Sequence, residues 1–386
     1  MTISEIQHDE LWDVIVIGAG VAGAFAAQQV AFGSNLRVLL IDAKKFPRAK
    51  ACGCCLNQRG LRVLDRAGLL SSVLELGGQR IQEIEFVVDG KRYGWSVPYM
   101  LSTSRARLDA HLVDLAQRAG VVFHDNTRGT VRPIQASDRT QELRRLELTQ
   151  PGHATRTVSA KIVVVADGLT QSSLSQLPDF ETRTEPMSRV GVQTSLPQHF
   201  VPGLRKSKLV MTIDKQAYIG MATVEAGQVD IAAAIEPRLL AHGVRPWQIV
   251  SQILTRNGQG FACEWEQFDW LATPHLTRRS TKCSDYRLIV IGDSLGYAEP
   301  FTGEGMSWAL RTAELAVPIV RQASVWSAGI EEFWEREIRQ KVVKKQWISR
   351  QLMQLVRHPR WTHCAARVCQ QVPAIQRWAM ECVTRG

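Results

Sequence analysis

Residues 13–23 read Asp13-Val-Ile-Val-Ile-Gly18-Ala-Gly20-Val-Ala-Gly23, the strongest indication of fold class in the sequence. A β-branched apolar run stops at Gly18, and three glycines follow at G-x-G-x-x-G spacing before a segment of helical composition. A second apolar run, 37–41, ends at Asp42. A strand, turn, helix and strand in this order predict a unit that binds a dinucleotide.

Each residue type in this unit has a physical role. Gly18 permits a tight turn, Gly20 lets backbone N–H groups approach a pyrophosphate, and Gly23 lets the helix pack closely on the strand. The positive N-terminus of the helix then faces the phosphates. Asp42 is placed to accept both hydroxyls of the adenosine ribose, which argues against a 2′-phosphate there. The predicted dinucleotide contacts of the unit are Gly18, Gly20, Ala22, Gly23 and Asp42.

Length and composition predict a folded protein of two domains. The chain has 386 residues, of which 45% are hydrophobic and 22% charged, as in ordinary globular proteins. Its eight cysteines form no regular framework, and no secretory signal precedes the first strand, so we expect reduced thiols in a cytoplasmic protein. Cys52 and Cys55 have C-x-x-C spacing, but no second pair or nearby His completes a ligand set, so no metal site is expected.

The loop that follows Asp42 starts beside the dinucleotide and can run along it toward the reactive ring. It contains Phe46-Pro-Arg-Ala-Lys50-Ala-Cys52-Gly53-Cys-Cys-Leu56. This phrase is similar to the K-P-C-G-G-G-L loop of geranylgeranyl reductases, a family that shares the p-hydroxybenzoate hydroxylase fold of FAD-dependent monooxygenases. The resemblance implies that the dinucleotide is FAD and that Cys52, Gly53 and Cys55 contact it. Cys54 and Cys55 replace two glycines of the family loop, so the backbone here is less free.

A second segment, 286–310, agrees with FAD. A strand delivers Gly292-Asp293, and Gly303-Glu-Gly305 opens a helix. This is similar to the G-D…P…G-x-G segment of FAD-dependent hydroxylases and reductases. The resemblance implies that Asp293 accepts a ribityl hydroxyl, and that amides at the helix start stabilise negative charge on the reduced flavin. The implied contacts are Asp293, Pro300, Gly303, Gly305 and Met306.

Three further positions carry the same resemblance. Arg105 opens a helix, where its charge opposes the helix dipole and indicates a nearby anion; its R-x-R-x-D context resembles the flavin-contacting arginine helix of the hydroxylase fold. Asp167 precedes Gly168 at the end of a buried strand, as in the D-G motif that supports the flavin site. The family also implies a backbone contact to the adenine near Val131.

The resemblance implies a mixed α/β fold, in which a doubly wound, Rossmann-like FAD-binding domain is interwoven with a β-sheet substrate domain and followed by a helical C-terminus. We assign 11–75, 101–180 and 275–325 to the FAD domain and 76–100 and 181–274 to the substrate domain, with 326–386 as the helical basic segment. Tyr218 is expected to face the substrate. It stands where the reductases begin a Y-x-W-x-x-P motif, but the Trp is missing here.

The net charge of +10 is concentrated near the C-terminus. Residues 336–360 hold eight Lys and Arg against one acid, interleaved with apolar residues. This amphipathic pattern is compatible with an anionic membrane surface, an acidic carrier protein or a solvated helix face. Nucleic acid is not an expected partner, because no nucleic-acid-binding fold signature accompanies the charge.

Two reactions on a small apolar or aromatic substrate compete. Reduced flavin and O₂ could hydroxylate or epoxidise it, as the hydroxylase fold implies, or a carbon–carbon double bond could be reduced, as the Cys52 loop implies. The missing Trp favours the monooxygenase. NADH or NADPH would act as the transient reductant, and Cys52 is either an acid near the flavin or a small packing residue. A non-catalytic flavoprotein or a carrier-docking protein is the alternative of another class.

Overall fold

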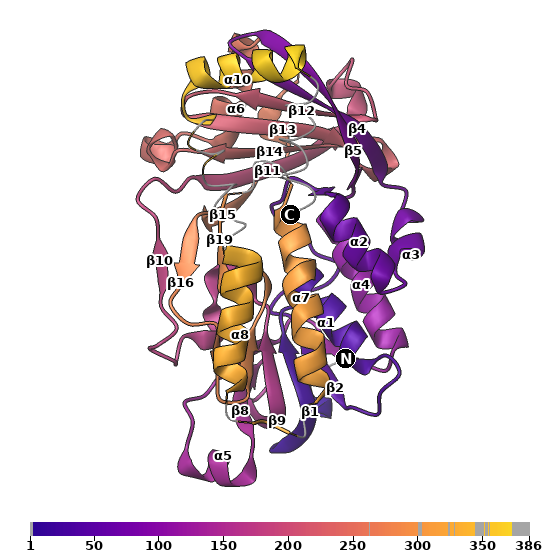
Figure 1. The fold of residues 1–386 in the computed structure, drawn as a ribbon, viewed down its shortest axis with the longest axis vertical. Helices are drawn as coiled ribbons and strands as arrows, with labels where there is room; N and C mark the ends of the chain where they lie inside the picture. Colours follow the sequence, from indigo (N-terminus) through magenta and orange to yellow (C-terminus); the bar gives the residue numbers. More distant parts are fainter. Residues whose placement is uncertain are drawn as a thin grey trace.

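The computed structural model describes residues 3–261, 263–299, 303–322, 325–327, 329–343, 351, 354 and 356–372. Two large sheets lie one above the other, the first in the lower half of Figure 1 and the second in the upper half.

The first sheet has a parallel centre. Its strand order is β17 (Ser284–Asp285), β18 (Leu288–Val290), β9 (Arg156–Val165), β1 (Glu10–Ile17), β2 (Val38–Ile41) and β6 (Val122–His124). β1 pairs in parallel with β2 and β9, and β9 pairs in parallel with β18. β7 (Arg128–Val131) and β8 (Arg144–Thr149) extend it by antiparallel pairing. The apolar runs of the sequence form these strands because both faces of a parallel sheet are covered.

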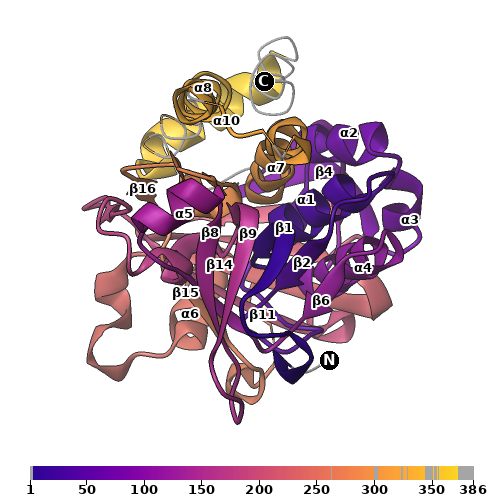
Figure 2. The ribbon, with the colours of Figure 1, turned by 90° about the horizontal axis from the view of Figure 1, so that it is seen from below.

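Helices cover one face of this sheet. They are α1 (Val21–Ala31), α4 (Arg105–Arg118) and α7 (Gly305–Arg321), and α1 and α7 lie side by side over β1 and β9, with α2 (Gln58–Arg66) packed on α7 (Figure 2). Alternate strand residues divide between two cores: Val14 and Val16 pack under the helices, whereas Ile15 and Ile17 pack on the opposite face.

The second sheet is mainly antiparallel. Its order is β15 (Leu271–His275), β11 (Val190–Pro197), β14 (Gln228–Ile235), β13 (Ala217–Thr223), β12 (Lys208–Ile213), β4 (Gln79–Val88), β5 (Lys91–Ser102) and β3 (Cys55–Leu56). β4 and β5 form the hairpin that Asp89-Gly90 predicts, and both turn residues have positive φ, as a type I′ turn requires. α6 (Pro246–Arg256) packs on one face.

Smaller elements complete the chain. β10 (Thr182–Thr184), β16 (Arg278–Ser280) and β19 (Gly296–Tyr297) form a third sheet, and α3 (Leu70–Leu74) and α5 (Ala136–Gln141) lie at the periphery. After α7 come α8 (Ile330–Ile338) and α10 (Pro359–Gln371). α10 packs on β4 and β5, where the Tyr93 hydroxyl lies 2.6 Å from Nδ1 of His363.

The predicted mixed α/β class is confirmed. The predicted domain boundaries stay a proposal, and one strand departs from them: β3 comes from the first assigned FAD segment but pairs with β5 of the second sheet. The first crossing between the sheets therefore lies in the cysteine loop. In the part of the chain that the structure describes, no helix combines the length and the apolar character needed to cross a bilayer.

Candidate active site at the junction of the two sheets

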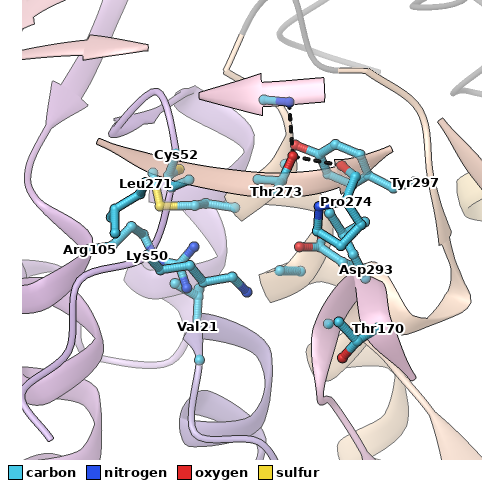
Figure 3. Close-up of a pocket in the computed structure, with 18 of the residues that line it drawn as sticks. Val21, Lys50, Cys52, Arg105, Thr170, Leu271, Thr273, Pro274, Asp293 and Tyr297 are labelled. Atoms are coloured by element: carbon cyan, nitrogen blue, oxygen red, sulfur yellow. Dashed lines mark hydrogen bonds between the residues drawn. The ribbon is translucent and has the colours of Figure 1, made fainter. Parts of the chain in front are cut away.

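A cavity of about 900 Å³ lies between the glycine-rich edge of the first sheet and one face of the second. In Figure 3, Lys50, Cys52 and Arg105 gather on one side of it, and Asp293 and Tyr297 lie on the other. The cavity is lined by the β1 turn, the loop after β2, the start of α7 and residues of β3, β11, β12, β13, β14 and β15 in the second sheet.

The β1 turn requires its glycines. Gly18 has φ of +100°, and a Cβ atom there would lie 2.4 Å from the carbonyl oxygen of Ala166. A Cβ atom on Gly23 would lie 1.8 Å from the carbonyl oxygen of Gly18. The start of α1 is therefore pressed against the turn, which leaves its N-terminal amides facing the cavity.

Two guanidinium groups face this helix start. A Cβ atom on Gly20 would lie 3.3 Å from Nη2 of Arg105 and 3.6 Å from Nη2 of Arg48. Arg105 is fixed by Asp109, one turn along α4, through two hydrogen bonds of 2.9 and 2.8 Å. Despite its burial, the charge of Asp109 holds the pKa of Arg105 well above its usual value. Two cations beside a helix N-terminus fit a pyrophosphate.

Asp42 lies at the end of β2, beside the glycine turn. Its carboxylate accepts a hydrogen bond of 2.9 Å from the Ala19 N–H and another of 2.9 Å from the Lys44 N–H. Arg48 pairs with the same carboxylate at 3.1 Å. Asp42 is thus held at the cavity wall by its own turn, where the sequence predicts the ribose contact.

The opposite end of the cavity is built from the second FAD-like segment. Asp293 follows Gly292, which has φ of +65°, and Gly305 begins α7 with its N-terminus toward the cavity. A Cβ atom on Gly305 would lie 2.8 Å from the Tyr297 hydroxyl. The glycine thus leaves room for Tyr297 at the helix start, where amides and dipole favour a negatively charged group.

Asp167 and Gly168 line the cavity near this end, and the Lys50 side chain extends toward Gly168. The Asp167 carboxylate accepts hydrogen bonds from the Ser173 N–H at 2.8 Å and from the Ser294 hydroxyl at 3.1 Å, and burial raises its pKa. Nζ of Lys50 lies 3.3 Å from the position of a Cβ atom on Gly168. Burial first, and then the charge of Arg105, lower the pKa of Lys50.

The cysteine loop forms the wall between the two halves. Cys52, Gly53 and Cys55 line the cavity, whereas Cys54 is buried behind them with φ of +52°. A hydrogen bond from the Cys54 thiol, and the charge of Arg105, lower the pKa of Cys52 to about 6. Burial raises the pKa of Cys55 to about 12.

The face of the second sheet forms an apolar wall. Small residues make the space, and larger apolar side chains surround it. Tyr218 is a polar group of this wall that an ion pair holds in place: it hydrogen bonds to Glu299, which pairs with Arg189 at 3.1 Å. Burial raises the pKa of Tyr218 well above its usual value, so it keeps its proton. The wall consists of Gly191, Val192, Leu209, Met211, Tyr218, Gly220, Ala232, Ala233, Ala234, Leu271, Ala272, Thr273, Pro274 and Leu276, and Tyr297 of β19 also lines the cavity.

Most of the predicted site residues line this single cavity, although the contacts predicted for them stay predictions. Gly23 lies behind Gly18 and serves packing. The Val131 side chain is buried in a core cluster, and its strand neighbours Arg128 and Gly129 line the cavity. Pro300 lies outside the described residues. The predicted residues at the cavity are Gly18, Gly20, Ala22, Asp42, Cys52, Gly53, Cys55, Arg105, Asp167, Tyr218, Asp293, Gly303, Gly305 and Met306.

Sequence reasoning missed three side chains at or next to the cavity: Arg48, Lys50 and Tyr297. Each lies in a segment that the sequence predicts to be near FAD, so its place in that segment could have indicated a site residue. The direction of each side chain depends on contacts with the other segments. In the described ranges, no group of His, Cys, Asp and Glu is arranged to hold a metal ion.

Comparison with known proteins agrees with this geometry. Residues 12–317 match a family model described as FAD binding domain. Menaquinone reductase of Mycobacterium tuberculosis is 24% identical over 396 residues, which cover 96% of this chain and 90% of that protein. Kynurenine 3-monooxygenase of Salinispora arenicola is 30% identical over 202 residues, which cover 49% of this chain and 40% of that protein.

Two solved structures show the same fold. A flavoprotein/dehydrogenase from Cytophaga hutchinsonii superposes with a TM-score of 0.73 at 18% identity, covering 90% of this chain and 86% of that one. The p-nitrophenol 4-monooxygenase PnpA from Pseudomonas putida superposes with a TM-score of 0.68 at 15% identity, covering 84% of each chain.

Proposed function

Since this chain belongs to the FAD binding domain family and is an FAD-dependent oxidoreductase, we propose that it reduces an uncharged, apolar acceptor with conjugated double bonds. A quinone is the acceptor class to test first. FAD supplies two-electron chemistry when it is bound. The residues of the chain position it, exclude water and select the acceptor.

The observation that carries this proposal is the composition of the second-sheet wall. Among its described residues there is no Lys, Arg or His. A carboxylated aromatic substrate would need a buried cation in this wall, because an unpaired buried charge costs several kcal/mol. Arg189 lies nearby, but Glu299 already pairs with it at 3.1 Å. The wall therefore suits an uncharged molecule.

Two further points support reduction. The curated menaquinone reductase matches this chain over nearly its whole length, whereas the monooxygenase match covers about half of it. Tyr218 keeps its phenolic proton at the wall. Its hydroxyl hydrogen bonds to Glu299, which pairs with Arg189, and the Arg189 guanidinium lies 5.5 Å from the centre of the Tyr218 ring. Such a group can hydrogen bond to the oxygen of a quinone as it gains electrons.

Monooxygenation is the second candidate, and Gly220 favours it. This residue stands at the Trp position of the Y-x-W-x-x-P motif, so the wall departs from the reductase pattern at the cavity itself. A Cβ atom on Gly220 would lie 3.1 Å from Sδ of Met211. The glycine therefore lets the Met211 side chain lie close to the strand, in part of the space that the Trp of the motif would need.

The test separates the two reactions by their oxidant. The yellow protein is mixed anaerobically with NADH or NADPH, and the rate of flavin bleaching identifies the donor. A quinone such as menadione is then added without oxygen. We expect rapid return of the flavin absorbance together with formation of the quinol. Substrate-dependent O₂ uptake with a hydroxylated product would instead establish the monooxygenase, and no reaction with either would indicate a non-catalytic flavoprotein.

A variant of the wall locates the acceptor. Gly220→Trp fills the second-sheet half of the cavity, so we expect FAD binding to persist while reoxidation by the quinone is lost. Ile219→Val is the matched control, because Ile219 is the preceding residue on the same strand and packs in the core beneath the opposite face. Equal rates in both variants would contradict an acceptor site at this wall.

We also propose that the basic segment 336–360 docks on an anionic membrane surface, where an apolar quinone would be met. The support is its charge in the sequence, since part of the segment lies outside the described residues. Cosedimentation with anionic vesicles, weakened by salt and absent with neutral vesicles, would agree with this docking. Binding to an acidic carrier protein without binding to vesicles would contradict it.

A further inference from the structure

The cysteine loop brings two thiols together at the wall of the cavity. The side chains of Cys52 and Cys54 are within hydrogen-bonding contact, and Sγ of Cys54 also lies 3.7 Å from the Cys52 carbonyl oxygen. Cys52 faces the cavity, whereas Cys54 is 2% exposed and lies behind it. The chain thus presents one accessible thiol and one sequestered thiol in contact.

The backbone at Cys54 is unusual for a side-chain-bearing residue. Its φ of +52° lies in the left-handed region, which favours glycine and is uncommon for cysteine. Packing alone gives no reason to keep a thiol in this conformation. Gly53, between the two cysteines, has open space where a Cβ would be, so the loop has room to adjust.

Each of the two thiols lies beside a different ionisable group. The charge of Arg105 lies beside Cys52 and favours its thiolate. The Cys54 thiol hydrogen bonds to the carboxyl of Asp230, a residue of β14 that is 2% exposed. Asp230 is oriented by Gln193, whose amide donates to it, and by Ser195 at 3.0 Å. One end of the pair favours a nucleophilic sulfur, and the other end has a proton acceptor.

We propose that Cys52 and Cys54 form a redox-active dithiol that exchanges two electrons with FAD, an activity separate from reduction of the apolar acceptor. The proposal rests on the contact between the two thiols, on the position of Cys52 at the cavity, and on the buried carboxyl behind Cys54.

The exchange balances without another reagent. The Cys52 thiolate and the Cys54 thiol lose two electrons and one proton, and an S–S bond of about 2.05 Å forms. The proton passes first to the Asp230 carboxylate. The two electrons, and finally the proton, are taken up by oxidised FAD. In the reverse direction a disulfide at this position takes two electrons and one proton from reduced FAD, so Cys52 returns as the thiolate and Cys54 as the thiol.

Cys55 is not the partner. It belongs to β3, which pairs with β5 opposite Ser102. Burial raises its pKa to about 12, so it stays protonated and unreactive. Because Cys52, Cys54 and Cys55 lie close together in the sequence, one peptide can show whether Cys52 pairs with Cys54 or with Cys55.

The first experiment detects the bond itself. The FAD-loaded protein is treated with a thiol oxidant such as diamide, alkylated under denaturing conditions, and cut with trypsin after Lys50 and Arg59. Peptide 51–59 contains Cys52, Cys54 and Cys55. We expect the oxidised wild-type peptide to carry a single alkyl group and an internal disulfide, and the dithiothreitol-reduced peptide to carry three.

Two variants assign the pair. Cys54→Gly keeps a residue that accepts the left-handed backbone, and its peptide should stay fully alkylated after oxidation. Cys55→Ala should still form the disulfide. Full alkylation of the oxidised wild type would overturn the proposal, and so would a disulfide that persists in Cys54→Gly, because it would join Cys52 to Cys55.

The second experiment tests the link to FAD. Dithiothreitol is added anaerobically to the yellow protein, without a nicotinamide nucleotide. We expect bleaching of the flavin in the wild type and in Cys283→Ala, which removes a thiol outside the cavity lining, and loss of that bleaching in Cys54→Gly. A wild type that forms the disulfide but is not bleached would overturn the electron exchange. Neither readout needs the apolar acceptor, so failure of the proposed reductase activity would leave these results unaffected.

Discussion

At the scale of single residues, Gly23 leaves the least room for change. A Cβ atom there would lie 1.8 Å from the Gly18 carbonyl oxygen and 3.2 Å from Cβ of Ala166. We expect Gly23→Ala to push α1 off the turn, to release FAD, and to lower the free energy of unfolding by about 3 kcal/mol. Urea unfolding and the yellow colour of the purified protein measure both effects.

A matched control for Gly23 exists elsewhere in the chain. Gly260→Ala would bring its Cβ atom no closer than 3.5 Å to Thr255, which is ordinary contact. We expect nearly unchanged stability and colour. Equal losses in the two alanine variants would show that helix packing on the turn does not explain the requirement for glycine.

Asp293 is predicted to bind the ribityl chain, and its removal should affect colour without affecting the fold. Asp293→Ala is expected to purify as a colourless protein with an unchanged circular dichroism spectrum, because the carboxylate lines the cavity and supports no core cluster. Asp293→Asn keeps an acceptor oxygen and should stay partly yellow. A fully yellow alanine variant would mean that the ribityl contact lies elsewhere.

Asp230 predicts a pH dependence of stability. Burial first, and then the charge of Cys52, raise its pKa from 3.8 to about 7 in the folded protein. The folded state therefore binds this proton more tightly than the unfolded state. Its contribution to the free energy of unfolding is fully present below pH 3.8 and is lost as the pH rises through about 7.

We expect the wild type to lose on the order of 3 kcal/mol more stability than Asp230→Asn between pH 4 and pH 8. Urea unfolding across this range measures the difference. The effect should be smaller in a Cys52→Ser background, where burial remains but the thiolate charge is gone. Parallel pH profiles of wild type and Asp230→Asn would contradict the raised pKa.

The sequence predicts those site residues whose role is fixed by the local backbone. Gly18 and Asp42 are examples, since their spacing around a strand and a helix determines their place. Asp230 and Lys50 are not predictable in this way. Asp230 reaches Cys54 only because β14 joins a sheet whose face covers the cysteine loop, and Lys50 reaches Gly168 across the cavity. Contacts between distant segments carry no local signature.

At the scale of elements, the start of α2 connects the cysteine loop to α7 through hydrogen bonds. Oδ1 of Asn57 accepts hydrogen bonds from the Arg59 N–H at 3.1 Å and the Gly60 N–H at 3.4 Å, which caps α2. The hydroxyl of Ser307 in α7 donates to the same oxygen at 2.5 Å. One side chain thereby joins α2 to α7, whose first residues line the cavity.

We expect Asn57→Ala to lower the free energy of unfolding by about 2 kcal/mol, because it removes a cap and leaves a buried hydroxyl without its acceptor. Ser307→Ala removes the contact between the helices and keeps the cap, so it should cost about 1 kcal/mol or less. Urea unfolding compares the two. A larger loss in Ser307→Ala would contradict the capping role of Asn57.

Elements with a strong local pattern were predictable, and those made by distant pairing were not. Asp89-Gly90 predicts the β4–β5 hairpin because the turn needs positive φ at both residues. β3 has no such pattern. Its two residues, Cys55 and Leu56, become a strand because Leu101 and Ser102 of β5 lie beside them.

At the scale of the whole molecule, the cavity lies between two independently packed sheets. The end of the cavity predicted to bind the nucleotide rests on β1, α1 and α4, whereas the apolar wall belongs to β11, β12, β13, β14 and β15 of the other sheet. The two sheets have separate cores, one under the helices and one beneath α6. A ligand long enough to reach from Gly20 to Tyr218 would therefore contact both sheets at once.

This arrangement predicts that FAD stabilises both sheets together. A ligand that binds the folded state adds about 2.7 kcal/mol to the free energy of unfolding at a hundredfold excess over its Kd. We expect hydrogen exchange to slow on addition of FAD both in α1 and in the cavity strands of the second sheet. ADP fills the nucleotide end alone, so it should protect α1 and leave β13 and β14 unchanged. If FAD protected the same segments as ADP and no others, the flavin ring would not reach the second sheet, and the apolar wall would lose its role as the acceptor site.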